Sequence, residues 1–105
     1  MDKIPVKIAR LLNKYIQKLE ENRISISRAV LFGSYAAGTV NEWSDIDIAL
    51  VSEVFEGVRI KDRNKIRKIT LDISTDLSPL PFRPEDFTPE DPFVREIIEH
   101  GINII

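Results

Sequence analysis

This chain contains no cysteine and only one histidine among its 105 residues. The absence of cysteine excludes disulfide bonds, thiol catalysis and thiolate metal sites together. His100 alone cannot form a histidine-based metal cluster, and its place just before Gly101 is typical of a favourable charge at a helix C-terminus. A metal site in this protein must therefore be built mainly from oxygen ligands.

Long apolar runs and a strong charge of either sign are also missing. No apolar stretch approaches the length of a membrane span, and no leader with charged and then apolar residues opens the sequence. Fifteen basic residues against 17 acidic ones give a formal charge of −2, which offers no general electrostatic reason to coat nucleic acid. We therefore expect a cytoplasmic protein that binds neither membranes nor nucleic acid directly.

Apolar periodicity predicts helices that alternate with strands. Apolar residues at helical spacing predict helices over about 5–21, 60–71 and 92–101, with Pro5 and Pro92 in first turns. Short apolar runs predict strands over 29–32, 45–51 and 73–80. The first strand is uniformly apolar, as expected for burial on both faces, and prolines 79, 81 and 84 are expected to end the third.

Ser34 is expected to cap a short helix over 35–37, which Gly38 then ends. The predicted fold class is α/β: one domain over residues 1–105, with a small mixed, partly antiparallel sheet and helices packed mainly on one face.

Two residue pairs carry the chemical signal. Gly33-Ser34 follows the first predicted strand, and after ten residues Asp45-Ile46-Asp47 opens the second. Residues two apart in a strand share a face, so Asp45 and Asp47 lie on one side within ~7 Å of each other. At ~5 Å and an effective dielectric near 20, two such charges repel by roughly 3 kcal/mol.

No nearby cation relieves that repulsion, because no Lys, Arg or His lies between Arg28 and Arg59. A hard divalent cation is the natural remedy, and Mg²⁺ typically takes one or two carboxylates together with substrate phosphates. Gly33 lets the backbone approach a phosphate closely, and Ser34 supplies a hydroxyl and an exposed amide at a helix start. Together the pairs indicate a metal-bound triphosphate and an in-line displacement at phosphorus.

With residues 33–38 (GSYAAG) followed by 44–51 (SDIDIALV), the sequence resembles the minimal nucleotidyltransferases of the DNA polymerase β-like superfamily. The resemblance extends over nearly the whole chain. It implies the polymerase β-like fold, with Gly33 and Ser34 as the nucleotide-binding pair and Asp45 and Asp47 as catalytic metal ligands. It also implies ATP as substrate and two Mg²⁺ ions as cofactors.

Members of this size resemble antitoxins that act on a HEPN-domain partner, which is usually a ribonuclease toxin. The implied activity is transfer of AMP from ATP to a tyrosine of that partner. Relatives often carry Lys or Arg where this chain has Ala37, which leaves Arg28 or the basic segment 59–68 to compensate. Two alternatives stay open: a binding module that neutralises the partner by occlusion, and nucleotidylation of a small molecule such as an aminoglycoside.

A third carboxylate is expected on a neighbouring strand, as a catalytic metal ligand. Asp72 and Asp76 are the candidates, and they lie about 13 Å apart if both are in one strand, so only one can serve. Asp72 falls where a basic helix should end, which is electrostatically unfavourable for an acid. The prediction is Asp76, placed mid-strand, with Asp72 as the alternative.

Two further features have both a plain and a functional interpretation. The segment 59–68 holds six basic residues against Asp62 alone, which is typical of a solvated helix face and also suits docking of an acidic or RNA-associated partner. Trp43 fits a loop residue packed over the domain, with stacking on a nucleobase as the functional alternative.

Overall fold

The computed structural model describes residues 4–41 and 44–105, so Trp43 lies outside the described residues. Nine elements follow one another along the chain: α1 (Val6–Glu21), β1 (Arg28–Phe32), α2 (Ser34–Ala37), β2 (Ile46–Val51), α3 (Arg59–Ile73), β3 (Leu77–Phe82), the 3₁₀ helix η1 (Pro84–Asp86), α4 (Pro92–His100) and β4 (Ile102–Asn103). The strands form one sheet in the order β3-β2-β1-β4. Because β2 is parallel to β3 whereas β1 is antiparallel to β2 and β4, the predicted mixed α/β fold is confirmed.

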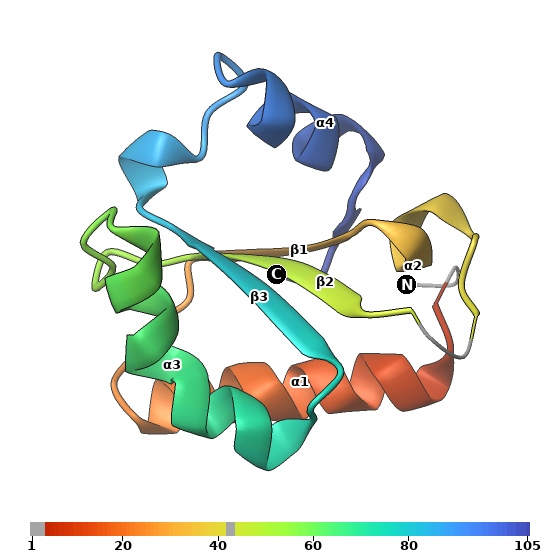
Figure 1. Cartoon of the computed structure of the whole chain (residues 1–105), viewed down its shortest axis with the longest axis horizontal. Coiled ribbons are helices and arrows are strands. Elements are labelled where there is room, and N and C mark those ends of the chain that lie inside the picture. The colour runs from red at the N-terminus through yellow and green to blue at the C-terminus, as the bar shows by residue number, and fades with distance from the viewer. Residues whose placement is uncertain (1–3, 42–43) are drawn as a thin grey trace.

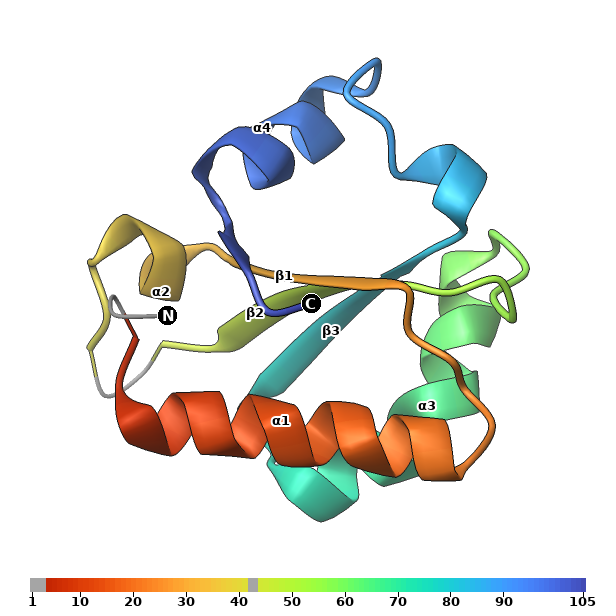
Figure 2. The same cartoon turned by 180° about the vertical axis from the view of Figure 1, so that it is seen from behind.

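The sheet is covered on both faces. Figures 1 and 2 show α1 and α3 against one face, and η1 and α4 against the other. Each face has its own apolar cluster, the larger one under α1 and the smaller one formed with Val94 and Ile97 of α4. The two longest helices, α1 and α3, share one face, in keeping with the prediction of helices mainly on one face, while the shorter α4 and η1 cover the other. The uniformly apolar β1 correctly indicated a strand buried on both sides.

The third strand begins later than predicted. Helical spacing continues through Ile69 and Ile73, so α3 runs to Ile73, and β3 covers Leu77–Phe82 rather than 73–80. Pro79 and Pro81 lie inside β3 instead of ending it. The carbonyls of Asp76 and Phe82 accept hydrogen bonds from the amides of Ile46 and Ser52, so the even-numbered residues of β3 direct their backbone groups toward β2. The odd-numbered residues, which include both prolines, direct theirs toward the open edge of the sheet. An edge strand tolerates proline there because no ladder donor is lost.

Three buried polar side chains hold the helices α1 and α3 and the loop before α3 in place. The hydroxyl of Tyr15 on α1 lies 2.6 Å from that of Thr70 on α3, and burial raises the pKa of Tyr15 to about 12. Asp62 is only 1% exposed, and its carboxylate accepts hydrogen bonds from the backbone amides of Glu56 (2.8 Å) and Gly57 (2.9 Å). Asp62 thus fastens the β2–α3 loop to the first turn of α3.

None of the helices within residues 4–41 and 44–105 combines the length and apolar character needed to cross a lipid bilayer.

Candidate active site

The Gly33-Ser34 pair lies where β1 passes into α2. Gly33 has φ 72° and ψ −143°, a backbone conformation that essentially only glycine adopts, and its carbonyl accepts hydrogen bonds from the amides of Ala36 and Ala37. Gly33 is therefore the N-cap residue, and the prediction that Ser34 caps the helix was wrong. Ser34 is instead the first residue of α2, and its hydroxyl makes no hydrogen bond with a described residue. That hydroxyl is available to a ligand.

The antiparallel register of β1 and β2 brings Asp47 to this turn. Phe32 pairs with Asp47, so the carboxylate of Asp47 lies beside Gly33, the next residue along the chain. A Cβ atom placed on Gly33 would overlap Oδ2 of Asp47 and lie 3.1 Å from its Cγ. The absence of a side chain at position 33 thus creates the space that the carboxylate occupies.

Asp45 and Asp47 are close enough to interact electrostatically. Partial burial raises the pKa of Asp47, and the negative charge of Asp45 raises it further. Asp45 itself is exposed, immediately before β2. A cation between the two carboxylates would offset both the loss of hydration at Asp47 and its repulsion by Asp45. These residues therefore fit a site for Mg²⁺ shared with substrate phosphates.

Replacing Asp47 by Asn is expected to raise the melting temperature of the metal-free protein by a few degrees at neutral pH. Since the folded-state pKa of Asp47 is raised, its ionised form costs stability above that pKa, and the neutral amide does not. The gain should vanish as the pH falls and Asp47 becomes protonated in the parent protein. Differential scanning calorimetry with EDTA measures it, with Asp72→Asn as the control. A lower melting temperature for Asp47→Asn would mean that the carboxylate has a structural role.

The candidates for the third carboxylate lie in different places. Asp76 is not mid-strand as predicted: it is an exposed turn residue just before β3, because α3 continues to Ile73. Its carbonyl accepts a 2.8 Å hydrogen bond from the amide of Ile46, and the parallel register sets it beside Asp45. Asp72 lies on α3 and forms an ion pair with Lys18 of α1 at 3.8 Å, so its carboxylate is directed toward α1.

Asp76 is accordingly the only one of the two next to the Asp45–Asp47 end of the sheet. Among residues 4–41 and 44–105, no three acidic or histidine side chains are close enough together to hold a metal ion. The role of Asp76 as a ligand therefore stays a prediction.

Arg28 does not replace the positive charge that relatives often carry at the position of Ala37. Arg28 begins β1, at the opposite end of that strand from Gly33, and its guanidinium lies 5.2 Å from the centre of the Phe87 ring. Helix α3, which carries the basic segment, covers the opposite face of the sheet from α4. The register places Asp47 on the α4 side together with Ala49 and Val51, so the basic segment does not supply the missing cation either.

A hollow of about 840 Å³ lies beside Gly33 and was not predicted from the sequence. It lies between α2 and α4, and Phe32 and Phe93 meet edge to face at its wall with ring centres 6.1 Å apart. Glu96, Glu99 and His100 line its outer part. Because α4 reaches this position only through the fold, no local pattern in the sequence could have indicated the hollow.

Fold and site together define a nucleotidyltransferase domain. The family described as "Nucleotidyltransferase domain" matches residues 12–104, and this chain belongs to it. A structure described as a putative nucleotidyltransferase from Sulfolobus solfataricus has the same fold, with a TM-score of 0.64 at 16% identity. The match covers 93% of this chain and 79% of that one.

Two proteins of Methanocaldococcus jannaschii are similar in sequence. One is named "Putative protein adenylyltransferase MJ1305" and is 35% identical over 81 residues, or 73% of this chain. The other, "Putative protein adenylyltransferase MJ0141", is 28% identical over 103 residues, or 94% of this chain. The match spans about half (53%) of the first relative and 97% of the second.

Proposed function

We propose that this protein is a Mg²⁺-dependent adenylyltransferase that transfers AMP from ATP to a tyrosine of a HEPN ribonuclease toxin, and so acts as a cytoplasmic antitoxin. The observation that carries the proposal is the packing of the Asp47 carboxylate against Gly33, which joins the carboxylate pair to the glycine–serine turn. Membership of the nucleotidyltransferase family and similarity to two proteins named as protein adenylyltransferases support it.

In the proposed reaction the acceptor oxygen attacks the α-phosphorus of ATP. A new oxygen–phosphorus bond forms, the bond to the bridging oxygen breaks, and pyrophosphate leaves while the hydroxyl proton passes to solvent. The backbone at Gly33 and the Ser34 hydroxyl would hold the triphosphate tail. Asp45 and Asp47 would hold Mg²⁺, with Asp76 on the acceptor side, and the metal would supply neutralisation of phosphate charge.

The hollow between α2 and α4 offers room for the nucleoside. It shares Gly33 with the phosphate-binding turn, and Phe93 at its wall is 49% exposed, so an aromatic face is available to a base. A ligand seated there would have its phosphates at Gly33 and Ser34, next to the carboxylates.

The choice of a protein acceptor follows from the resemblance and from the similar proteins. MJ0141, of which the match covers 97%, is named as a protein adenylyltransferase. The HEPN partner and its tyrosine come from the resemblance to antitoxin-type nucleotidyltransferases.

Radiolabelled ATP tests the proposal directly. With the purified partner and Mg²⁺, label on the α-phosphate should appear on the partner, whereas label on the γ-phosphate should not. Asp47→Asn should reduce incorporation by about a thousandfold, the scale of losing an electrostatic contact of the transition state. EDTA should abolish it. Equal labelling by the parent protein and Asp47→Asn would reject the enzymatic proposal.

The second candidate function is neutralisation by occlusion. It is favoured by Ala37, which leaves α2 without a cation, and by the absence of a three-carboxylate cluster among the described residues. A variant with Asp45→Asn and Asp47→Asn distinguishes the two functions in cells that express the toxin. Protection that persists in this variant supports occlusion, whereas lost protection with an intact complex supports catalysis.

A further inference from the structure

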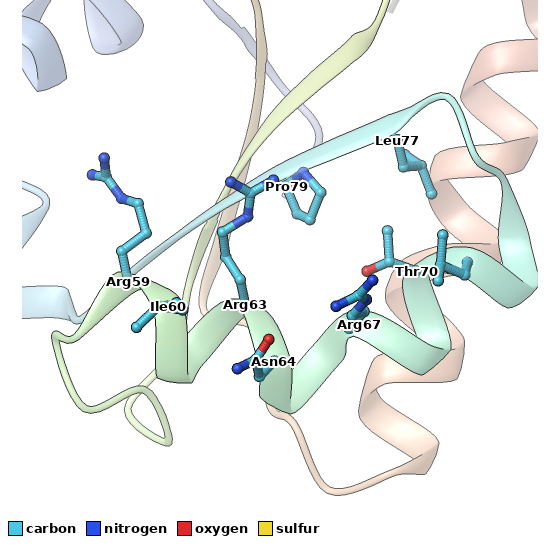
Figure 3. Close-up of a pocket in the computed structure, with 9 residues that line it drawn as sticks. Arg59, Ile60, Arg63, Asn64, Arg67, Thr70, Leu77 and Pro79 are labelled. Atoms are coloured by element: carbon cyan, nitrogen blue, oxygen red, sulfur yellow. The ribbon is translucent and has the colours of Figure 1, made fainter.

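We propose that the groove between α3 and the edge strand β3 docks an acidic amphipathic helix of a protein partner. This groove, of about 680 Å³, lies against the opposite face of the sheet from α4, and Figure 3 shows its lining residues. Arg59, Arg63 and Arg67 follow one another along it at four-residue spacing. In a helix that spacing sets successive side chains about 6 Å apart in one row.

The arginine row carries uncompensated positive charge. None of its three guanidinium groups forms an ion pair with a described residue, although Arg59 lies 6.0 Å from the centre of the Phe82 ring. The one acid of this segment, Asp62, is buried and bonded to backbone amides, so it does not neutralise the row. A partner with negative charges about 6 Å apart would match it, as glutamates four residues apart in a helix do.

The groove is also apolar, which favours a protein over nucleic acid. Ile60 is 70% exposed and Leu71 52% exposed, and both line the groove together with Leu77 and Pro79 of β3. Uncovered aliphatic side chains beside charged ones suit a helix with one apolar and one acidic stripe. None of the described lining residues is aromatic, so the groove has no platform on which a base could stack.

The edge of β3 excludes an added strand as the occupant. The nitrogens of Pro79 and Pro81 face this edge and carry no hydrogen to donate, so an extended peptide would lose the ladder bonds that give such complexes their affinity. A helix lying in the groove requires no backbone bonds from β3.

The position of the groove relates it to the candidate active site. It extends along β3 from Arg59, near Phe82, to Leu77, which directly follows Asp76. One end of a docked helix would therefore lie beside Asp76, at the end of the sheet that also carries Asp45 and Asp47, although the carboxylate of Asp47 lies on the other face. Only the next step depends on the proposed function: if that function holds, the docked protein is the acceptor of AMP.

Binding of a synthetic peptide tests the docking without nucleotide or catalysis. The probe is a fluorescent helical peptide of about 14 residues, with glutamates at every fourth position beside a stripe of leucines. The control peptide has the same composition with both stripes scrambled. Anisotropy should show binding of the striped peptide that weakens with salt, and at least tenfold weaker binding of the scrambled one.

Charge reversal on α3 supplies matched protein variants. Arg63→Glu with Arg67→Glu should weaken binding of the striped peptide at least tenfold. Lys61→Glu with Lys68→Glu changes the same helix by the same charge at exposed positions outside the groove. This variant should weaken binding of the striped peptide less than threefold. Leu71→Ser should weaken binding with little change in its salt dependence.

Four results would overturn the proposal. Two come from the peptide assay: no binding of the striped peptide, or an equal loss of binding in both double variants. The other two are tighter binding of a single-stranded RNA of similar charge, and self-association of the parent protein in sedimentation that is abolished by Arg63→Glu with Arg67→Glu. The first two remove the groove as a charged site, and the last two assign it to another occupant. Failure of AMP transfer with peptide binding intact would instead count against the proposed function.

Discussion

Replacing Gly33 by alanine is expected to lower the rate of the proposed AMP transfer by about a hundredfold or more, the scale of an ångström-sized misplacement in an active site. The new Cβ would overlap Oδ2 of Asp47, so the carboxylate would have to leave its position against the turn. The rate of label transfer from ATP measures the effect. A shift of the Asp47 carboxyl resonance in the NMR spectrum of the metal-free protein would show the displacement itself.

Gly38→Ala is the control for this prediction. Gly38 also has a positive φ, 76° against 72° at Gly33, but a Cβ there meets no atom within 4 Å. The Gly38→Ala substitution should lower the stability by roughly 1–2 kcal/mol, because alanine disfavours a left-handed backbone, and it should leave the carboxylates undisturbed. Transfer by Gly38→Ala should therefore stay within about threefold of the parent rate. Equal loss of transfer in both variants would mean that the shape of the turn, and not the position of Asp47, limits the reaction.

Truncation of Asp62, the one buried carboxylate among residues 4–41 and 44–105, is expected to lower the stability of the protein more than truncation of any other acidic side chain in those ranges. Asp62→Ala removes two charge-assisted hydrogen bonds and leaves the amides of Glu56 and Gly57 without their acceptor. We expect a loss of about 3 kcal/mol and a melting temperature lower by roughly 10–20 °C for a domain of this size. Thermal unfolding followed by circular dichroism measures it.

Two further variants make that prediction specific. Asp62→Asn keeps one acceptor oxygen and should lose about half as much stability. Asp72→Ala, on the same helix, removes only an exposed ion pair with Lys18 and should change stability by less than about 0.5 kcal/mol. A similar loss in Asp62→Ala and Asp72→Ala would show that the loop contacts of Asp62 contribute little to stability.

The sequence was sufficient to predict the fold class and the position of the central strands, because both depend on local patterns. The apolar run before Gly33 and the alternation after Asp45 indicated two strands, and the antiparallel register of β1 and β2 brings the two pairs together. Spacing along the chain predicted which side chains share a face, but it carried no information on that register.

The parts that were mispredicted depend on contacts distant in sequence. The start of β3 was wrong because Ile73 suits a strand as well as a helix, and packing of α3 against α1 decides between them. Pro79 and Pro81 indicated the end of a strand only because its place at the sheet edge was not known. Asp62 was counted as one acid in a basic segment, since nothing local reveals that its carboxylate binds the amides of the preceding loop.

The two edges of the sheet have a consequence for the behaviour of the protein at high concentration. Exposed strand edges are the usual templates for aggregation and fibril growth, and β3 presents proline rings there while β4 is only two residues long. Neither edge offers a continuous row of amide donors to a neighbouring molecule. This chain should therefore tolerate crowded solution and concentrated storage without cross-molecular sheet formation.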